Sequence, residues 1–295
     1  MMNRLFGGPL LATLSCLAAC SDQQGAGPSA PATTYDLRPD IPIGTENYIC
    51  YAFDANFDQG ATVRAVHWTV PVGGGVVWHH ATLYAVTESF PDGPAPCDGM
   101  PQGSTSMHVW TPGGGGLVLP VDAGLSLPSG TRRFVIELHV LRGKDGPAGS
   151  GSVEVQWGTD PVAHVAAFFA VTAPVPAIRP QTTETSSTTC TFGAAAHLWS
   201  IWPHMHRIGH AVEATLRPVG RAPSALIHVE PWNFSAQYTY PLDVDVAPGD
   251  AIESQCWWTN TTNEYVLPGL KSSDEMCNQS LVGWPAAALP CVTSP

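Results

Sequence analysis

The sequence predicts an all-β fold, and three observations lead to this prediction. Short apolar or alternating runs of strand length recur from residue 48 onward, separated by clusters of glycine and proline. The chain holds 29 glycines and 28 prolines among 295 residues, and both residues are poor helix formers. Turn sequences such as Pro112-Gly113-Gly114 and Pro248-Gly249-Asp250 occur between the runs, as is typical of sandwiches and barrels.

The predicted strands form two groups. Those of the first half cover residues 62–70, 76–86, 133–141, 153–157 and 162–171. Those of the second half cover residues 197–203, 211–216, 225–229 and 252–259. A stretch rich in Thr, Pro and Ser separates them and places a linker at residues 173–183, between domains at 36–172 and 184–295. Each domain is long enough for the core of an eight-stranded sandwich.

Composition limits the partners of the protein. Twelve basic and 24 acidic residues give a net charge of -12. Because no segment concentrates Lys and Arg, a nucleic-acid partner is not expected. Ten Trp, nine Phe and seven Tyr provide enough apolar area for a folded core, which argues against disorder driven by charge.

The N-terminus has the features of an export signal. Arg4 precedes an apolar run over residues 5–19, which is short for a membrane span. The sequence Leu17-Ala18-Ala19-Cys20 resembles the lipobox of bacterial lipoproteins, in which the cysteine carries a diacylglyceryl group; an ordinary signal peptide with a chance cysteine is the alternative. We expect a signal peptide at residues 1–19, lipidation at Cys20 and a flexible tether at 20–35. The mature protein would lie in the cell envelope (periplasmic or outer-membrane face), touching the membrane only through its lipid.

The cysteine count agrees with export. Removing the two cysteines of the export region leaves six of the eight, an even number that favours three disulfides in an oxidising compartment. The sequence alone permits 15 connectivities. A thiolate zinc site is a weak alternative, because no two cysteines have CxxC spacing.

Two groups of histidines are candidate metal ligands. His79 and His80 are adjacent in a predicted strand, where neighbouring side chains face opposite ways. They can share a metal only if the strand bulges and a third ligand, such as His139, arrives from another strand. By spacing alone, two unrelated histidines on opposite faces is the better interpretation. His204 and His206, two residues apart, lie on one face of a strand.

Met276 would ordinarily be read as core filler. If it joins His204 and His206, two imidazoles and a thioether form a donor set suited to copper, especially Cu(I).

These residues occur in an order that resembles a known family. His79-His80, His139, the segment His204-Met205-His206 and the string Asp-Glu-Met-Cys-Asn at 274–278 follow one another at fitting separations. The series is similar to the copper type II, ascorbate-dependent monooxygenases, which include peptidylglycine α-hydroxylating monooxygenase and dopamine β-monooxygenase. The resemblance spans residues 48–291, and the string at 274–278 is its most specific part.

The resemblance implies two consecutive jelly-roll β-sandwich domains and two copper ions per chain. The first domain would hold an electron-delivering copper on His79, His80 and His139. The second would hold the oxygen-activating copper on the catalytic residues His204, His206 and Met276, facing the first across an open cleft. The implied reaction is hydroxylation of a C–H bond in a small-molecule substrate, with dioxygen and a one-electron reductant such as ascorbate. The same resemblance pairs Cys50 with Cys97, Cys190 with Cys291, and Cys256 with Cys277.

The sequence departs from the peptide-amidating members at the substrate. Trp202 stands where they hold the substrate carboxylate with an arginine, and Ser280 stands where they have a tyrosine. Asn278 is retained, so Trp202 and Asn278 are the candidate substrate-binding residues. Losing the guanidinium removes a bidentate clamp for a carboxylate. A glycine-extended peptide is therefore not the expected substrate, and a neutral, aromatic or apolar molecule fits better. Glu137 replaces a glutamine near the third histidine and could lower a copper potential.

Two other functions remain open. A copper-binding or copper-storing lipoprotein without turnover would keep the ligands but need no substrate-holding residues. A zinc hydrolase would need a general base beside a histidine-rich site. Glu137 is the one candidate for that base, and a thioether ligand makes little sense for zinc.

Overall fold

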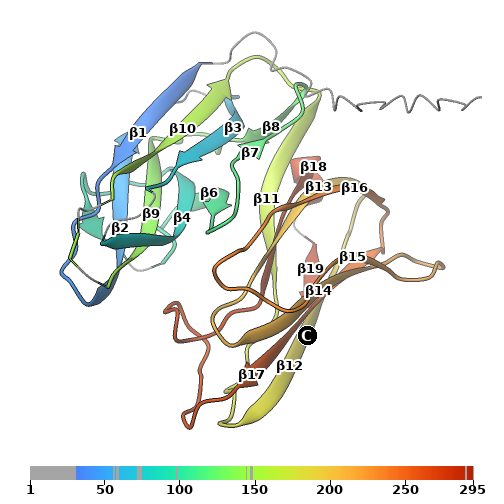
Figure 1. The fold of residues 1–295 in the computed structure, drawn as a ribbon. Coiled ribbons are helices and arrows are strands. Elements are labelled where there is room, and N and C mark those ends of the chain that lie inside the picture. Colours follow the sequence, from blue (N-terminus) through green and yellow to red (C-terminus); the bar gives the residue numbers. More distant parts are fainter. Residues whose placement is uncertain are drawn as a thin grey trace, which may run out of the picture.

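The computed structural model describes residues 31–55, 57, 60–71, 75–97, 99–143, 145–146, 149–289 and 291–294. The predicted signal peptide, Cys20 and most of the predicted tether lie outside the described residues. In the part that is described, 19 strands are accompanied by a single 3-10 turn, Ala286–Ala288. This confirms the all-β prediction (Figure 1). None of the described segments is a helix long and apolar enough to cross a membrane.

The strands form three sheets. The largest has the order β1 (Ala32–Leu37), β10 (Gly151–Gly158), β3 (Thr62–Thr69), β8 (Ala123–Ser126), β11 (His164–Thr172), β18 (Asn278–Trp284), β13 (Ala196–His204) and β16 (Tyr240–Val246), with β7 (Leu117–Val118) paired to β3. The second has the order β5 (Ala95–Pro96), β2 (Thr45–Asp54), β9 (Arg133–Arg142), β4 (Val76–Val86) and β6 (Ser104–Trp110). The third has the order β15 (Ser224–Val229), β14 (Gly209–Arg217), β17 (Ala251–Asn260), β12 (Thr182–Thr191) and β19 (Val292–Ser294). Each strand predicted from the sequence overlaps one of these.

The N-terminal half is a sandwich because its strands bury alternate residues. In β10, Val153 and Val155 are fully buried, whereas Glu154 between them is not. These side chains and their neighbours from β1, β3 and β8 pack against Ile136 and Leu138 of β9 in one continuous apolar core. The three-histidine strands β4 and β9 are adjacent and antiparallel in the second sheet.

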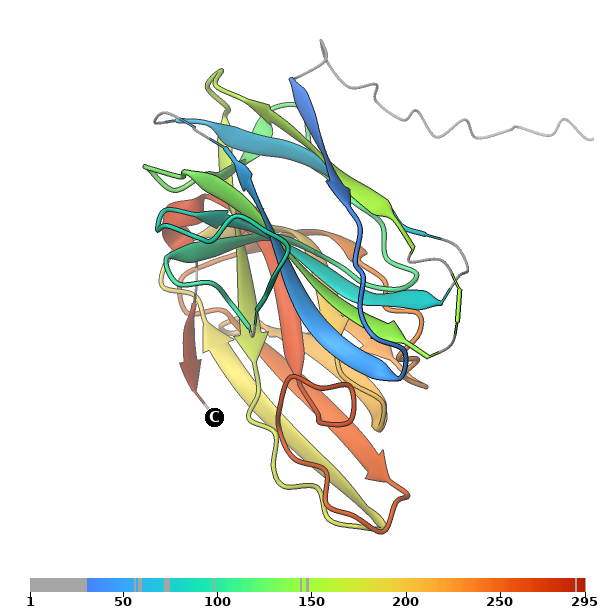
Figure 2. The same cartoon turned by 90° about the vertical axis from the view of Figure 1, so that its left-hand side faces the viewer.

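The C-terminal half packs its part of the largest sheet on the third sheet. Leu198, Ile201 and Leu281 of β13 and β18 meet Leu216 and Ile252 of β14 and β17 in a second apolar core. Strand β11 joins the two halves: it pairs with β8 in parallel and with β18 in antiparallel orientation. Figure 2 shows β11 passing from the upper, N-terminal group of strands to the lower, C-terminal group. The division into two jelly-roll domains stays a prediction, since one sheet runs through both halves.

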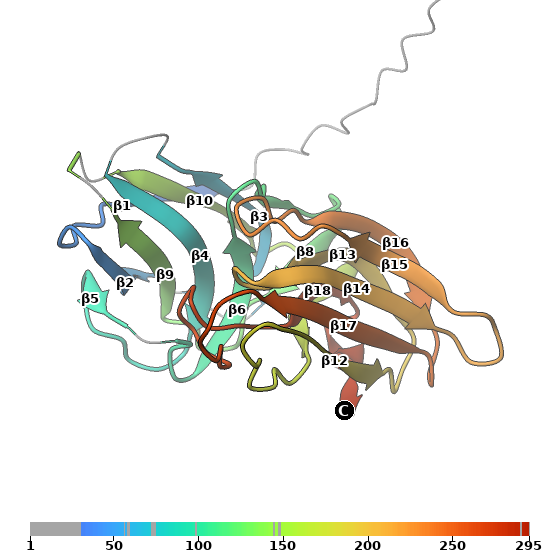
Figure 3. The same ribbon diagram turned by 60° about the horizontal axis from the view of Figure 1, so that its bottom comes forward.

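Three disulfides are present, and they have the connectivity that the family resemblance implies. They join Cys50 to Cys97, Cys190 to Cys291 and Cys256 to Cys277. The last one links β17 to the end of the segment between β17 and β18 (residues 261–277), which we call the Met276 loop. Figure 3 shows this loop leaving the C-terminal half toward the strands of the N-terminal half.

Candidate metal centre

The first candidate site consists of His79, His80 and His139, which we call the three-histidine set. Trp78 lies opposite Val140 in the β4–β9 pair, but His80 lies opposite His139, so His79 is the extra residue of a bulge. The bulge turns both neighbouring imidazoles toward β9. One nitrogen from each ring lies within 4.8 Å of the others. The structure therefore brings His79 and His80, for which alternation alone favoured opposite faces, together with His139.

Hydrogen bonds decide which nitrogen of His139 is available. Its Nε2 lies 2.6 Å from Oε1 of Glu46, so Nε2 carries the proton and donates it. The free Nδ1 then faces Nδ1 of His79 at 3.0 Å. Nε2 of His79 and Nδ1 of His80 are buried and have no hydrogen-bond partner among the described residues. Buried nitrogens without partners are unfavourable unless a ligand satisfies them.

The second candidate site begins where β13 ends. His204 is the last residue of β13, and His206 follows two positions later on the same face. Met205 between them is fully buried in an apolar cluster on the opposite side. Nδ1 of His204 lies 2.7 Å from Oε1 of Gln237, and Nδ1 of His206 lies 3.1 Å from the carbonyl oxygen of Asp274. Both Nδ1–H groups donate to these oxygens, which leaves both Nε2 atoms as ligand nitrogens.

Glu275 fixes the Met276 loop to the His-x-His segment. Its carboxylate accepts hydrogen bonds from the backbone N–H of His206 at 3.0 Å and of Ile208 at 2.9 Å. It also accepts one from the indole N–H of Trp258 at 3.0 Å. The side chain is almost fully buried. The carboxylate of Glu275, the residue before Met276, thus holds the backbone of His206 in place.

Met276 is placed beside this pair by strand register. His204 lies opposite Asn278 in the antiparallel β13–β18 pair, so Met276, two residues before Asn278, lies near the end of β13, and it lines the same cavity as His204. The amide of Asn278 donates to Sδ of Met276 at 3.5 Å. The disulfide from Cys256 to Cys277 ties the next residue to β17. The sulfur therefore belongs to a segment that is fixed on both sides.

The two sets adjoin, whereas the resemblance implied sites facing each other across an open cleft. The ring centroids of His80 and His204 are 6.2 Å apart, and those of His79 and His206 are 6.4 Å apart. Five imidazoles thus form one contiguous group. The expectation of an open gap between the sets is not met.

Contacts between the halves explain this proximity. The indole N–H of Trp202 donates to Oγ1 of Thr111 at 3.1 Å, and that hydroxyl donates to the carbonyl of Gln237 at 3.0 Å. The ring of Phe234, from the same loop as Gln237, stacks on His79 with centroids 4.3 Å apart. One C-terminal loop, residues 230–239, therefore covers a histidine of the first set and orients His204 of the second.

The sequence analysis did not predict a role for four of these supporting residues: Glu46, Phe234, Gln237 and Glu275. Glu275 lies within the string at 274–278, and its position beside Met276 was the available signal. The other three have no such signal. Glu46 belongs to β2, and Phe234 and Gln237 belong to a loop, so no spacing relates them to the histidines that they contact.

Burial favours the neutral form of four of the imidazoles, which is the form that binds metals. Burial, together with the neighbouring histidines, lowers the pKa of His79 to about 2. Burial also lowers the pKa of His139 and of His206 to about 4 each, and that of His204 well below its ordinary value. Burial has the opposite effect on an acid and raises the pKa of Glu275 to about 7.

A cavity of about 290 Å³ lies against both sets. His80 and Glu137 line it from the first half, and His204, Met276 and Asn278 line it from the second. Its aromatic lining residues are Tyr48, Tyr84, Phe168 and Trp202. Trp202 also stacks on His204 with centroids 4.9 Å apart. Both candidate substrate-binding residues thus face the space next to the ligands.

Comparison with known families identifies the second half. Residues 162–294 match the family described as copper type II ascorbate-dependent monooxygenase, C-terminal domain. These residues, less than half of the chain, are similar to that domain. The matched region includes His204, His206 and Met276, and it begins after the three-histidine set.

Other comparisons add no relative. No curated protein matches the sequence. A solved T=1 particle of infectious bursal virus shares 10% identity and a TM-score of 0.24 over 89% of this chain and 71% of that one. A xanthan lyase from Paenibacillus shares 11% identity and a TM-score of 0.22 over 87% of this chain and 25% of that one. Likenesses this weak carry no argument.

The donor atoms fit the metal of the copper monooxygenase family. Nε2 of His206 is buried without a partner in the described part of the chain. With Nε2 of His204 and the thioether of Met276, it makes a nitrogen and sulfur set that favours copper over magnesium or calcium. The three-histidine set offers nitrogen alone. The carboxylate of Glu137, 3.8 Å from Nε2 of His80, adds negative charge beside that set.

Proposed function

We propose that the protein is a copper-dependent monooxygenase that hydroxylates a C–H bond of a small molecule. The reaction converts R–H, dioxygen, two electrons and two protons into R–OH and water. Ascorbate, acting twice as a one-electron donor, would supply the electrons. Copper held by the two sets would supply the one-electron redox chemistry and the activation of dioxygen.

The observation that carries this proposal is the shared cavity. It is lined by His80 of the nitrogen-only set and by His204 and Met276 of the set that includes sulfur. A substrate in this cavity would lie against ligands of both kinds. A storage protein has no need for two chemically different sites around one cavity, which supports an enzyme over copper storage.

The cavity lining also limits the substrate. Its described lining residues include no lysine or arginine, but they do include the carboxylate of Glu137. A substrate carboxylate would therefore meet repulsion rather than a guanidinium clamp. The indole of Trp202 and the ring of Phe168 offer apolar surface instead. We propose a small aromatic or apolar substrate and not a glycine-extended peptide.

Metal analysis of two matched variants tests the sites. Met276→Leu removes the proposed sulfur ligand, whereas Met205→Leu removes a sulfur that faces the apolar cluster; both swaps nearly conserve volume. We expect two copper ions per chain in the wild type and in Met205→Leu, falling toward one in Met276→Leu. Two zinc ions in the wild type, or equal copper in all three proteins, would refute the assignment.

Oxygen uptake separates the enzyme from copper storage. The copper-loaded protein is mixed with ascorbate and a panel of aromatic and apolar compounds, and oxygen consumption is compared with product formation. The proposal expects uptake coupled to a hydroxylated product from at least one compound, and weaker uptake in Met276→Leu. Full copper loading with no coupled uptake across the panel would favour storage.

We also propose that the protein is exported and anchored by lipid at Cys20. The apolar run and the small residues before this cysteine support the proposal. Labelling cells with a radioactive fatty acid should mark the wild type and not Cys20→Ser. Equal labelling, or none in either protein, would contradict it.

A further inference from the structure

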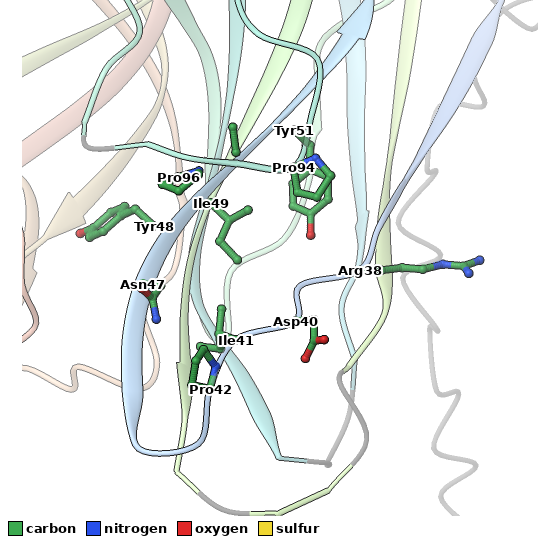
Figure 4. A pocket seen from close by; sticks show the side chains of 11 residues that line it. Arg38, Asp40, Ile41, Pro42, Asn47, Tyr48, Ile49, Tyr51, Pro94 and Pro96 are labelled. Carbon is green, nitrogen blue, oxygen red and sulfur yellow. The ribbon is translucent and has the colours of Figure 1, made fainter.

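Two residues of β2 connect the three-histidine set to the Met276 loop. Glu46 and Tyr48 alternate along the strand and so face the same side. Figure 4 shows Tyr48 on the opposite side of β2 from Ile49 and Tyr51; all three border a cavity of about 330 Å³, and Tyr48 also lines the cavity beside the histidines. The side chains of Glu46 and Tyr48 both contact His139.

Each of the two side chains makes one contact in each half of the protein. Glu46 holds Nε2 of His139 at 2.6 Å and accepts the backbone N–H of Ser272 at 3.1 Å. The ring of Tyr48 stacks on His139, with centroids 4.2 Å apart and planes 8° from parallel. Its hydroxyl donates to the backbone carbonyl of Leu270. Sequence separations of more than 220 residues are thus bridged at two neighbouring points.

The part of the Met276 loop that Glu46 and Tyr48 contact is held by hydrogen bonds within the loop. The backbone N–H of Asp274 donates to the carbonyl of Lys271 at 2.9 Å, and the Asp274 carboxylate accepts the N–H of Lys271 at 3.1 Å. The carbonyl of Asp274 in turn accepts the proton of His206 Nδ1. A displacement at Ser272 is therefore passed to His206 and to Met276.

We infer that Glu46 and Tyr48 are positioning residues that set the distance between the two metal sets. The inference rests on the proposed function for the identity of the metal. Glu46 has two tasks: it fixes His139 with Nδ1 free as the ligand atom, and it holds the loop that presents Met276. Tyr48 supports the same ring from its face and holds the same loop at a second point.

This role differs from that of an ordinary surface contact. A carboxylate that touched only Ser272 would stabilise the loop and leave His139 unaffected. A carboxylate that touched only His139 would tune one set and leave the loop unaffected. Because Glu46 makes both contacts with the same oxygen, Oε1, its loss should change both sets at once.

Amide hydrogen exchange of the metal-free protein tests the link without depending on copper. In the double variant Glu46→Ala/Tyr48→Phe, exchange across residues 270–276 should become at least ~10-fold faster, since two hydrogen bonds that hold the loop are lost. Glu88→Ala is the matched control, because Glu88 is an exposed carboxylate of the same half. Unchanged exchange in a folded double variant would overturn the inference.

Electron paramagnetic resonance of the Cu(II)-loaded protein, read through the dipolar line broadening between the two ions, tests the consequence. The wild type and Glu88→Ala should give one narrow distance between the two ions, and the double variant a longer, broader distribution. Glu46→Gln keeps an acceptor for Ser272 and should restore much of the narrow distribution. Equal distributions in wild type and double variant would overturn the inference. A wild type without copper would refute the proposed function, while the exchange result would still decide the link.

Discussion

Replacing Glu275 with alanine should destabilise the protein by about 3 kcal/mol, and the structure supplies the terms. Three donors would lose their acceptor: the buried N–H groups of His206 and the Trp258 indole, and the part-buried N–H of Ile208. Each such loss costs about 2 kcal/mol. Against this, the pKa of Glu275 is raised from 4.5 to about 7, so its charged form is disfavoured in the folded protein. Removing that charge recovers about 3 kcal/mol at pH 8.

The assay is thermal unfolding of the metal-free protein at pH 8. A loss of about 3 kcal/mol corresponds to a fall of about 6–12 °C in Tm for a chain of this size. Glu264→Ala is the control, because Glu264 is an exposed residue of the same Met276 loop. If Glu275→Ala unfolds within about 2 °C of the control, the carboxylate does not hold the loop as described.

Three further changes test other parts of the site. Gln237→Leu removes the acceptor of the His204 Nδ1 proton, so competition with a chelator should show copper affinity of that set about 10–100-fold weaker. Urea unfolding of the metal-free protein should show stability falling as pH decreases from 6.5 to 4, since the buried imidazoles have pKa values of about 4 or less when folded and ordinary values when unfolded. The raised pKa of Glu275 acts in the opposite sense, but a single group is outweighed by several histidines; a flat profile would contradict this. Replacing Cys256 and Cys277 together by alanine opens a link across 21 residues, and calorimetry should register a loss of about 3 kcal/mol.

The sequence predicted the parts of the site that depend on strand periodicity. Two residues of separation placed His204 and His206 on one face, and Met205 between them is buried on the other side. His79 and His80 are different, because regular alternation separates adjacent side chains. Only the bulge in β4 brings them together, and a bulge depends on the pairing with β9 rather than on the local residues.

The sequence did not predict how close the two sets are. That distance is determined by contacts between chain segments that are far apart in sequence, such as Thr111 with Gln237 and Glu46 with Ser272. Such contacts follow from the packing of whole sheets, and the hydrophobic pattern of the sequence does not predict them. The same reason explains why the orienting residues were missed, whereas the candidate ligands could be proposed from spacing and from the family resemblance.

The ligands differ in how they are supported, and this bears on their proposed roles. His79, His80, His139 and His204 belong to strands within sheets, where backbone pairing fixes their positions. His206 and Met276 lie beyond the strand ends and depend on other supports: the Glu275 carboxylate, a disulfide and the contacts of β2. An electron-delivering site benefits from ligands that do not move between oxidation states. A site that must admit dioxygen and substrate would benefit from a weaker sulfur ligand, and the Met276 loop offers one from a segment that these supports hold in place.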